Sequence, residues 1–189
     1  MIGLLPKSLE IGGKKYKIRT DYRVVLELFQ AFNDETLTDS EKILVCINGL
    51  FENPEDIPSE CLEEALQKAN WFFDGGDIPK SKATPDRTFD WKHDEHMIFS
   101  AVNKTAGCEV RALKYLHWWS FLGYFSESGE SLLSTVLSIR IKKMKGKPLD
   151  KSEREFYNEH KNLINILSEQ DKKDLKETEN FVNQLFTPK

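Results

Sequence analysis

The stretch Tyr115-Leu-His-Trp-Trp-Ser-Phe-Leu-Gly-Tyr-Phe125 decides the fold, because it holds six aromatic residues in eleven positions. It predicts a helix over residues 111–125 that is apolar on nearly every side, which suits the centre of a core. The alternative is that one face also lines a groove for a partner helix, where aromatic side chains dominate binding. The predicted partner-binding residues are Tyr115, Trp118, Trp119, Phe121, Tyr124 and Phe125.

Apolar residues recur with helical spacing on both sides of this stretch. Thr38 and Asp150 each begin a capping-box pattern, with Glu41 and Glu153 three residues later. The sequence therefore predicts an all-α fold, mainly a helical bundle of about seven or eight helices. Besides 111–125, helices are predicted from about Thr20, Thr38 and Pro58 onward, and over 94–104, 130–143, 150–167 and 171–186.

Residues 9–18 have a different pattern, typical of a small N-terminal β-hairpin. Gly12-Gly13 supplies the positive φ angles of a tight turn. Tyr16 and Ile18 alternate with lysines, as in a half-buried strand. Two strands are marginally stable alone, so the hairpin is expected to lie on helices or to pair with another chain.

A polar segment rich in Gly, Pro and Lys over residues 74–88 is long for a loop inside a compact domain. It is expected to be flexible or functional, and it is a candidate boundary between two subregions. We predict a helical core domain with the hairpin over 1–147 and a charged C-terminal helical hairpin over 148–189.

Charge is unevenly distributed along the 189 residues. Residues 1–90 carry 11 Lys/Arg and 17 Asp/Glu, hence −6, whereas residues 91–189 carry 16 and 14, hence +2. Opposite fields steer association, so copies of the chain are predicted to self-associate. The net charge of −4 argues against a dedicated nucleic-acid binder. The basic run of Arg140, Lys142, Lys143, Lys145 and Lys147 allows a nucleic-acid contact, but cations at a helix C-terminus are the commoner interpretation.

No catalytic motif is present: the sequence has no nucleophile elbow, no phosphate-binding loop and no His-Glu-x-x-His. The protein is predicted not to be an enzyme and to need no cofactor. His93 and His96 are spaced for one helix face, but a helix start with acids near its positive end explains this cluster better than a metal site. His117 is predicted to hydrogen-bond within the bundle.

The three cysteines form no disulfide framework and are typical of a reducing compartment. The N-terminal residues do not resemble a signal peptide, and no segment reaches the roughly 18 apolar residues of a membrane span. We expect a soluble protein of the cytoplasm, with no membrane partner.

Several segments in order along residues 85–145 resemble a tail protein family of long-tailed phages and prophages of Gram-positive bacteria. They are Arg87-Thr-Phe-Asp-Trp-Lys-His-Asp94, Ile98 with Ala101, Leu116-His-Trp-Trp-Ser-Phe121 and Ile139-Arg140. The Leu-His-Trp-Trp-x-Phe segment is the most specific. The residues after Pro148 look longer than the family's short tail.

The resemblance implies a tail assembly chaperone, encoded just before the tape measure protein. Such proteins coat the long, hydrophobic, helical tape measure in the host cytoplasm and are absent from the mature virion. A long amphipathic helix exposes an apolar stripe that a helical partner with an aromatic groove can cover. The alternatives are a structural tail or head–tail completion protein that stays in the virion, and, less favoured, a nucleic-acid-binding regulator.

Overall fold

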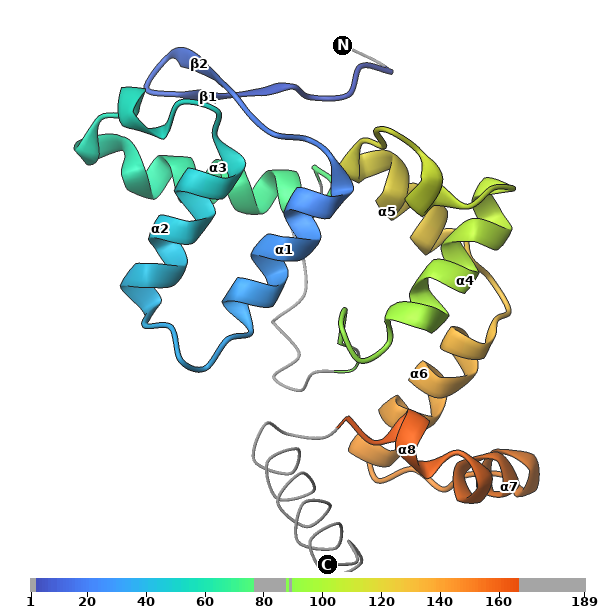
Figure 1. The fold of residues 1–189 in the computed structure, drawn as a ribbon. Coiled ribbons are helices and arrows are strands. Elements are labelled where there is room, and N and C mark those ends of the chain that lie inside the picture. The colour runs from blue at the N-terminus through green and yellow to red at the C-terminus, as the bar shows by residue number, and fades with distance from the viewer. Residues whose placement is uncertain (1–2, 77–87, 89, 167–189) are drawn as a thin grey trace, which may run out of the picture.

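A computed structural model describes residues 3–76, 88 and 90–166. Within these residues the chain forms eight α-helices and one antiparallel two-stranded sheet (Figure 1). The prediction of an all-α fold with a small N-terminal hairpin is therefore confirmed. The predicted helix over 171–186 and most of the predicted loop over 74–88 lie outside the described residues.

Two groups of elements follow one another along the chain (Figure 1). The first group comprises β1 (Ser8–Ile11), β2 (Lys14–Lys17), α1 (Tyr22–Phe32), α2 (Asp39–Leu50), η1 (Pro54–Asp56), η2 (Ser59–Cys61) and α3 (Leu62–Phe73). The second comprises α4 (Glu95–Ala106), η3 (Val110–Ala112), α5 (Trp118–Ser126), α6 (Leu132–Met144), α7 (Lys151–Glu159) and α8 (Lys161–Ile164). Helix α5 contacts both α1 and α4, so it joins the two groups.

The hairpin forms as the sequence predicts and rests on helices. Gly12 and Gly13 have φ angles of 55° and 75°, the left-handed values that a two-residue hairpin turn needs. Leu9, Ile11 and Tyr16 are buried, and β1 packs against α3. The surface that the hairpin requires is therefore supplied within the chain.

The core is continuous through both groups and is rich in aromatic rings. Tyr22 of α1 stacks on Phe121 of α5, with ring centroids 4.6 Å apart and planes 3° from parallel. Trp118 also stacks on Phe121 of the same helix, and Phe29 of α1 meets Trp118 edge-on. These rings make the junction between α1 and α5 the aromatic centre of the fold.

The predicted helix over 111–125 is wrong in its first half. Helix α5 begins only at Trp118, because the backbone before it pairs with the chain that enters α1. The Trp118 N–H donates to Thr20 O at 2.8 Å, and the Tyr22 N–H donates to Leu116 O at 3.0 Å. These bonds across about 95 positions of sequence are long-range, so the local apolar pattern did not reveal them.

The predicted single helix over 150–167 is also divided. Helix α7 ends at Glu159, His160 leaves helical geometry at φ −122° and ψ 37°, and the short α8 follows. Both predicted capping boxes are present, at Thr38–Glu41 and Asp150–Glu153. The predicted boundary at residue 148 stays a prediction; the described residues that follow it contact α6 through both α7 and α8.

Candidate functional site

The six aromatic residues predicted to bind a partner have different surroundings. Trp118 and Phe121 are fully buried in the core, at 1% and 0% exposed, so neither presents a surface in this conformation. Trp119, Tyr124 and Phe125 are half-buried against the core, and Tyr115 is 51% exposed. The structure thus divides the set into core residues and surface residues, and partner binding by the latter stays a prediction.

The two adjacent tryptophans both bond to the end of α3. The Trp118 indole N–H donates to Phe73 O at 2.9 Å, and the Trp119 indole N–H donates to Phe72 O at 2.8 Å. Carbonyls in the last turn of a helix have no partner within the helix, and the indoles bind two of them. Phe72 O also accepts the Gly75 N–H at 3.2 Å. The tryptophans therefore cap α3 as well as filling the core.

His117 is buried and hydrogen-bonds within the fold, as predicted. Its Nδ1 accepts the Trp119 N–H at 3.0 Å, which caps the start of α5, and its Nε2 lies 2.9 Å from Pro6 O. Because Nδ1 accepts, the proton is on Nε2 and is donated to Pro6 O. Burial lowers the pKa of His117 below its ordinary value; the hydrogen bond to Pro6 O opposes this shift, and the charge of Lys7 adds to it.

Exposed apolar residues lie on the two segments that meet at this contact. Leu4 and Leu5, which are 64% and 43% exposed, directly precede Pro6, whose carbonyl meets His117. Leu113 and Tyr115, both exposed, lie on the segment that leads into His117. We call Leu4, Leu5, Leu113 and Tyr115 the Leu4–Tyr115 surface.

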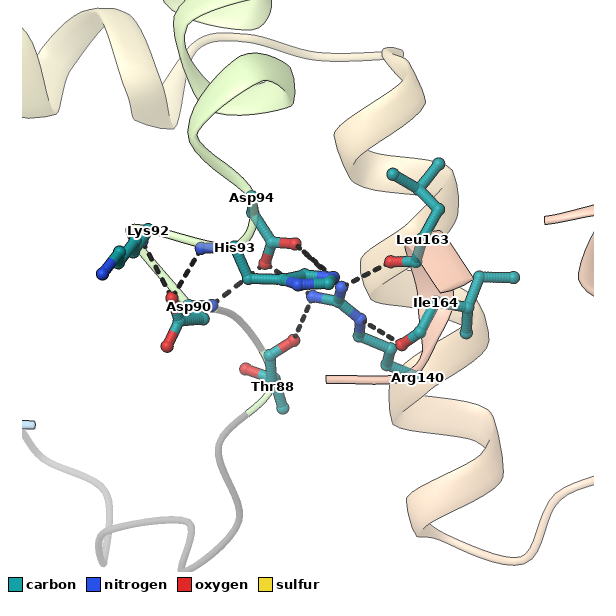
Figure 2. Close-up of polar contacts among 8 residues, drawn as sticks. All are labelled: Thr88, Asp90, Lys92, His93, Asp94, Arg140, Leu163 and Ile164. Carbon is teal, nitrogen blue, oxygen red and sulfur yellow. Dashed lines mark hydrogen bonds and ion pairs between the residues drawn. The ribbon is translucent and has the colours of Figure 1, made fainter. Parts of the chain in front are cut away.

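A buried ion pair is the most connected polar feature in the described residues. Arg140 of α6 binds Asp94, at the start of α4, through two bonds: Nη1 to Oδ2 at 2.6 Å and Nη2 to Oδ1 at 2.8 Å (Figure 2). The Arg140 side chain is 7% exposed and that of Asp94 is 0% exposed. Such a fork-to-fork pair is the strongest geometry available to these groups.

The remaining N–H groups of Arg140 bind main-chain carbonyls. Nε donates to Ile164 O at 2.7 Å, Nη2 to Leu163 O at 2.8 Å and Nη1 to Thr88 O at 3.2 Å (Figure 2). A guanidinium has five N–H donors, and here all five have acceptors. Arg140 thus ties α8 and Thr88 to the start of α4.

Asp94 is further held by its neighbours. Its Oδ2 accepts the Asp90 N–H at 3.0 Å, while Asp90 Oδ1 accepts the N–H groups of Lys92 and His93 (Figure 2). His93 Nε2 is buried 3.9 Å from Asp94 Oδ1 and has no hydrogen-bond partner among the described residues. The Asp90–Asp94 cluster therefore orders the start of α4.

The basic run that suggested a nucleic-acid contact is largely engaged inside the protein. Arg140 is buried, Lys142 pairs with Glu153 at 2.5 Å, and Lys143 lies 3.8 Å from the centre of the Tyr157 ring. Lys145 and Lys147 are exposed. Three of the five cations thus contact the segment that follows α6, and two face solvent.

Sequence reasoning missed the Asp94–Arg140 pair, although one signal was available. Leu133, Val136 and Arg140 occupy positions i, i+3 and i+7 of α6, so Arg140 lies on the stripe that faces the core. A charged residue at a core position requires a buried partner. Its partner, 46 positions away, does not follow from local periodicity.

Two other features are absent from the part of the chain that the structure describes. No group of three or more His, Cys, Asp or Glu residues in this part of the chain could hold a metal ion. No helix within it is long and apolar enough to cross a membrane.

Comparison with known proteins gives one match. The family model described as "Bacteriophage Gp15 protein" matches residues 1–166, which includes the hairpin, all eight described helices and the Asp94–Arg140 pair. The match extends past Pro148, so α7 and α8 are part of the family region, and residues 167–189 lie beyond it. No curated protein and no solved structure matches the chain. The chain therefore belongs to the bacteriophage Gp15 protein family.

Proposed function

We propose that this phage protein is a tail assembly chaperone that binds the tape measure protein and keeps it soluble until the tail tube forms around it. The observation that carries the proposal is the family match over residues 1–166, together with the Leu116–Phe121 segment typical of phage tail proteins. The function requires a surface for apolar helices and no chemistry.

The Leu4–Tyr115 surface is the part of the fold that best suits this partner. It combines exposed leucines with the exposed ring of Tyr115. The aromatic rings of the core, in contrast, already pack against one another. Attraction between apolar surfaces is non-directional, which tolerates a partner whose sequence varies along its length. We therefore assign tape measure binding to Leu4, Leu5, Leu113 and Tyr115, with half-buried Trp119, Tyr124 and Phe125 as further candidates.

Binding is tested by co-expressing the full chain with the tape measure protein of the same phage and purifying the complex through a wash at about 1 M salt. The screening length then falls to about 3 Å, so a complex held by exposed charges dissociates and one held by apolar contacts survives. The proposal expects survival. Loss of the tape measure in this wash, with retention at low salt, contradicts apolar binding.

A structural tail or head–tail completion protein, the rival role, would remain in the mature virion, whereas a chaperone would be absent from it. Mass spectrometry of purified virions tests this directly. The chaperone proposal expects the tape measure protein in the particles and this chain absent from them. Recovery of this chain in stoichiometric amounts from virions favours the structural role.

A further inference from the structure

Residues 150–166, which contain α7 and α8, form an arm with little buried surface. Ile164, at 2% exposed, is the one buried residue of this arm, and none of the nine residues of α7 is buried. By contrast, α4 has five buried residues and α6 has four. Segments with few buried apolar contacts open locally at a lower free energy than the core.

Polar contacts from one end of α6 hold this arm, and Phe156, Tyr157 and Leu163 pack, partly buried, against the core. Arg140 donates to the carbonyls of Leu163 and Ile164, Lys142 pairs with Glu153, and Lys143 donates to Asn165 Oδ1 at 3.2 Å. The junction is not close-packed: a pocket of about 280 Å³ is lined by Arg140, Lys143 and Met144 on α6 and by residues 164–166 on the arm. An incompletely packed junction loses fewer contacts on separation than a close-packed one.

The ion pair at the base of the arm does not depend on it. Asp94 and Thr88, which take three of the five bonds of Arg140, both precede α4 and lie outside the arm. Removing the arm would leave the Arg140–Asp94 pair intact and would return two carbonyls and two N–H donors to water. The five residues between α6 and the arm include Gly146, at φ 62°, and Pro148, which end α6 and separate it from α7.

We propose that residues 150–166 open and close as one unit while α1 to α6 stay folded. Opening uncovers the apolar contact surface of Ile164 on α6 and frees the Nε and Nη2 donors of Arg140.

The test is hydrogen–deuterium exchange followed by mass spectrometry on the full chain at neutral pH. Amides of α7 and α8 are expected to exchange at least about tenfold faster than those of α4 and α6, since they exchange through local opening. Ile164→Ala removes the buried anchor and should speed exchange in the arm by about tenfold more. Asn162→Ala, at an exposed position of the same helix, is the matched control and should change neither region.

Tryptophan fluorescence during urea unfolding gives an independent measure, because Trp71, Trp91, Trp118 and Trp119 all lie outside the arm. The proposal expects the urea midpoint of Ile164→Ala to equal that of the unmodified protein. Equal exchange in the arm and in α4, or an Ile164→Ala variant that accelerates exchange in both and lowers the urea midpoint, would overturn it.

Discussion

Trp118 and Trp119 are neighbours in the sequence whose surroundings predict different costs of removal. Trp118 is enclosed among Phe29, Phe121 and the end of α3, whereas Trp119 is half-buried. Trp118→Ala is expected to lower the free energy of unfolding by about 3–5 kcal/mol, the usual cost of emptying a core site. Trp119→Ala should cost about 1–3 kcal/mol, through partial burial and one lost hydrogen bond. Urea unfolding of both variants measures the difference; equal midpoints would show that the two rings are equally buried.

Substitutions of Asp94 and Arg140 are expected to have non-additive effects on the free energy of unfolding. Arg140→Met leaves the Asp94 carboxylate buried without its cation and should cost about 3–5 kcal/mol of stability. Adding Asp94→Leu removes that unpaired charge, so the double variant should be more stable than Arg140→Met alone. Recovery should be incomplete, because the carbonyl of Thr88, which lies outside the arm, still lacks its donor. A double variant that is less stable than Arg140→Met would contradict a role of the pair in charge compensation.

Because of His117, the free energy of unfolding is expected to depend on pH near neutrality. Its folded pKa lies below the unfolded value of 6.5, so below pH 6.5 the unfolded state binds the proton more readily. Stability should therefore fall as pH decreases from 6.5 toward the folded pKa and should be insensitive to His117 above 6.5. Protonation also places an N–H on Nδ1, where it meets the Trp119 N–H instead of accepting from it.

The matched variants are His117→Asn, which keeps an N-cap acceptor but does not titrate, and His96→Asn at an exposed position of α4. Urea midpoints between pH 5.5 and 8 should fall less steeply for His117→Asn than for the unmodified protein. The slope for His96→Asn should equal that of the unmodified protein. If the slope of the urea midpoint against pH is unchanged in His117→Asn, His117 is not the source of the pH dependence.

At the scale of elements, two helical glycines predict opposite effects of the same substitution. An added Cβ at Gly123 of α5 meets nothing within 4 Å, so Gly123→Ala should stabilise by about 0.5–1 kcal/mol through helix propensity. At Gly49 of α2, a Cβ would lie 2.5 Å from Leu28 Cδ2, a buried side chain of α1. Gly49→Ala should therefore destabilise despite the same gain in propensity. Thermal unfolding of both variants checks the signs, and stabilisation by both would show that α1 and α2 separate easily.

Periodicity and capping predicted most elements because these signals are local. The Gly12-Gly13 turn and the Thr38 and Asp150 capping boxes formed where the sequence placed them. The first half of the 111–125 helix was wrong because Leu116 and Trp118 bond to residues near position 20. The Asp94–Arg140 pair was missed for the same reason, because its two partners are 46 positions apart in the sequence.

At the scale of the whole molecule, the candidate surface was predictable only in part. The aromatic set 115–125 contained one residue of the Leu4–Tyr115 surface, Tyr115, but also Trp118 and Phe121, which the fold uses in its core. Leu4 and Leu5 precede Pro6, whose bond to His117 spans 111 positions of sequence, so local patterns could not place them with Tyr115. Self-association and nucleic-acid binding stay predictions, and three of the five cations proposed for the latter are engaged within the chain.

The central claim, that this chain keeps a tape measure protein soluble through the Leu4–Tyr115 surface, is tested most directly by the soluble fraction of that protein after co-expression. Leu4→Asp places a charge on this surface, and Leu44→Asp places the same charge on α2 at a similarly exposed leucine, 59% against 64%. We predict that the tape measure is soluble with the unmodified chain and with Leu44→Asp, and that it aggregates with Leu4→Asp and when expressed alone. A tape measure that is equally soluble alone would contradict the chaperone role, and equal solubility with both variants would contradict the assignment of the surface.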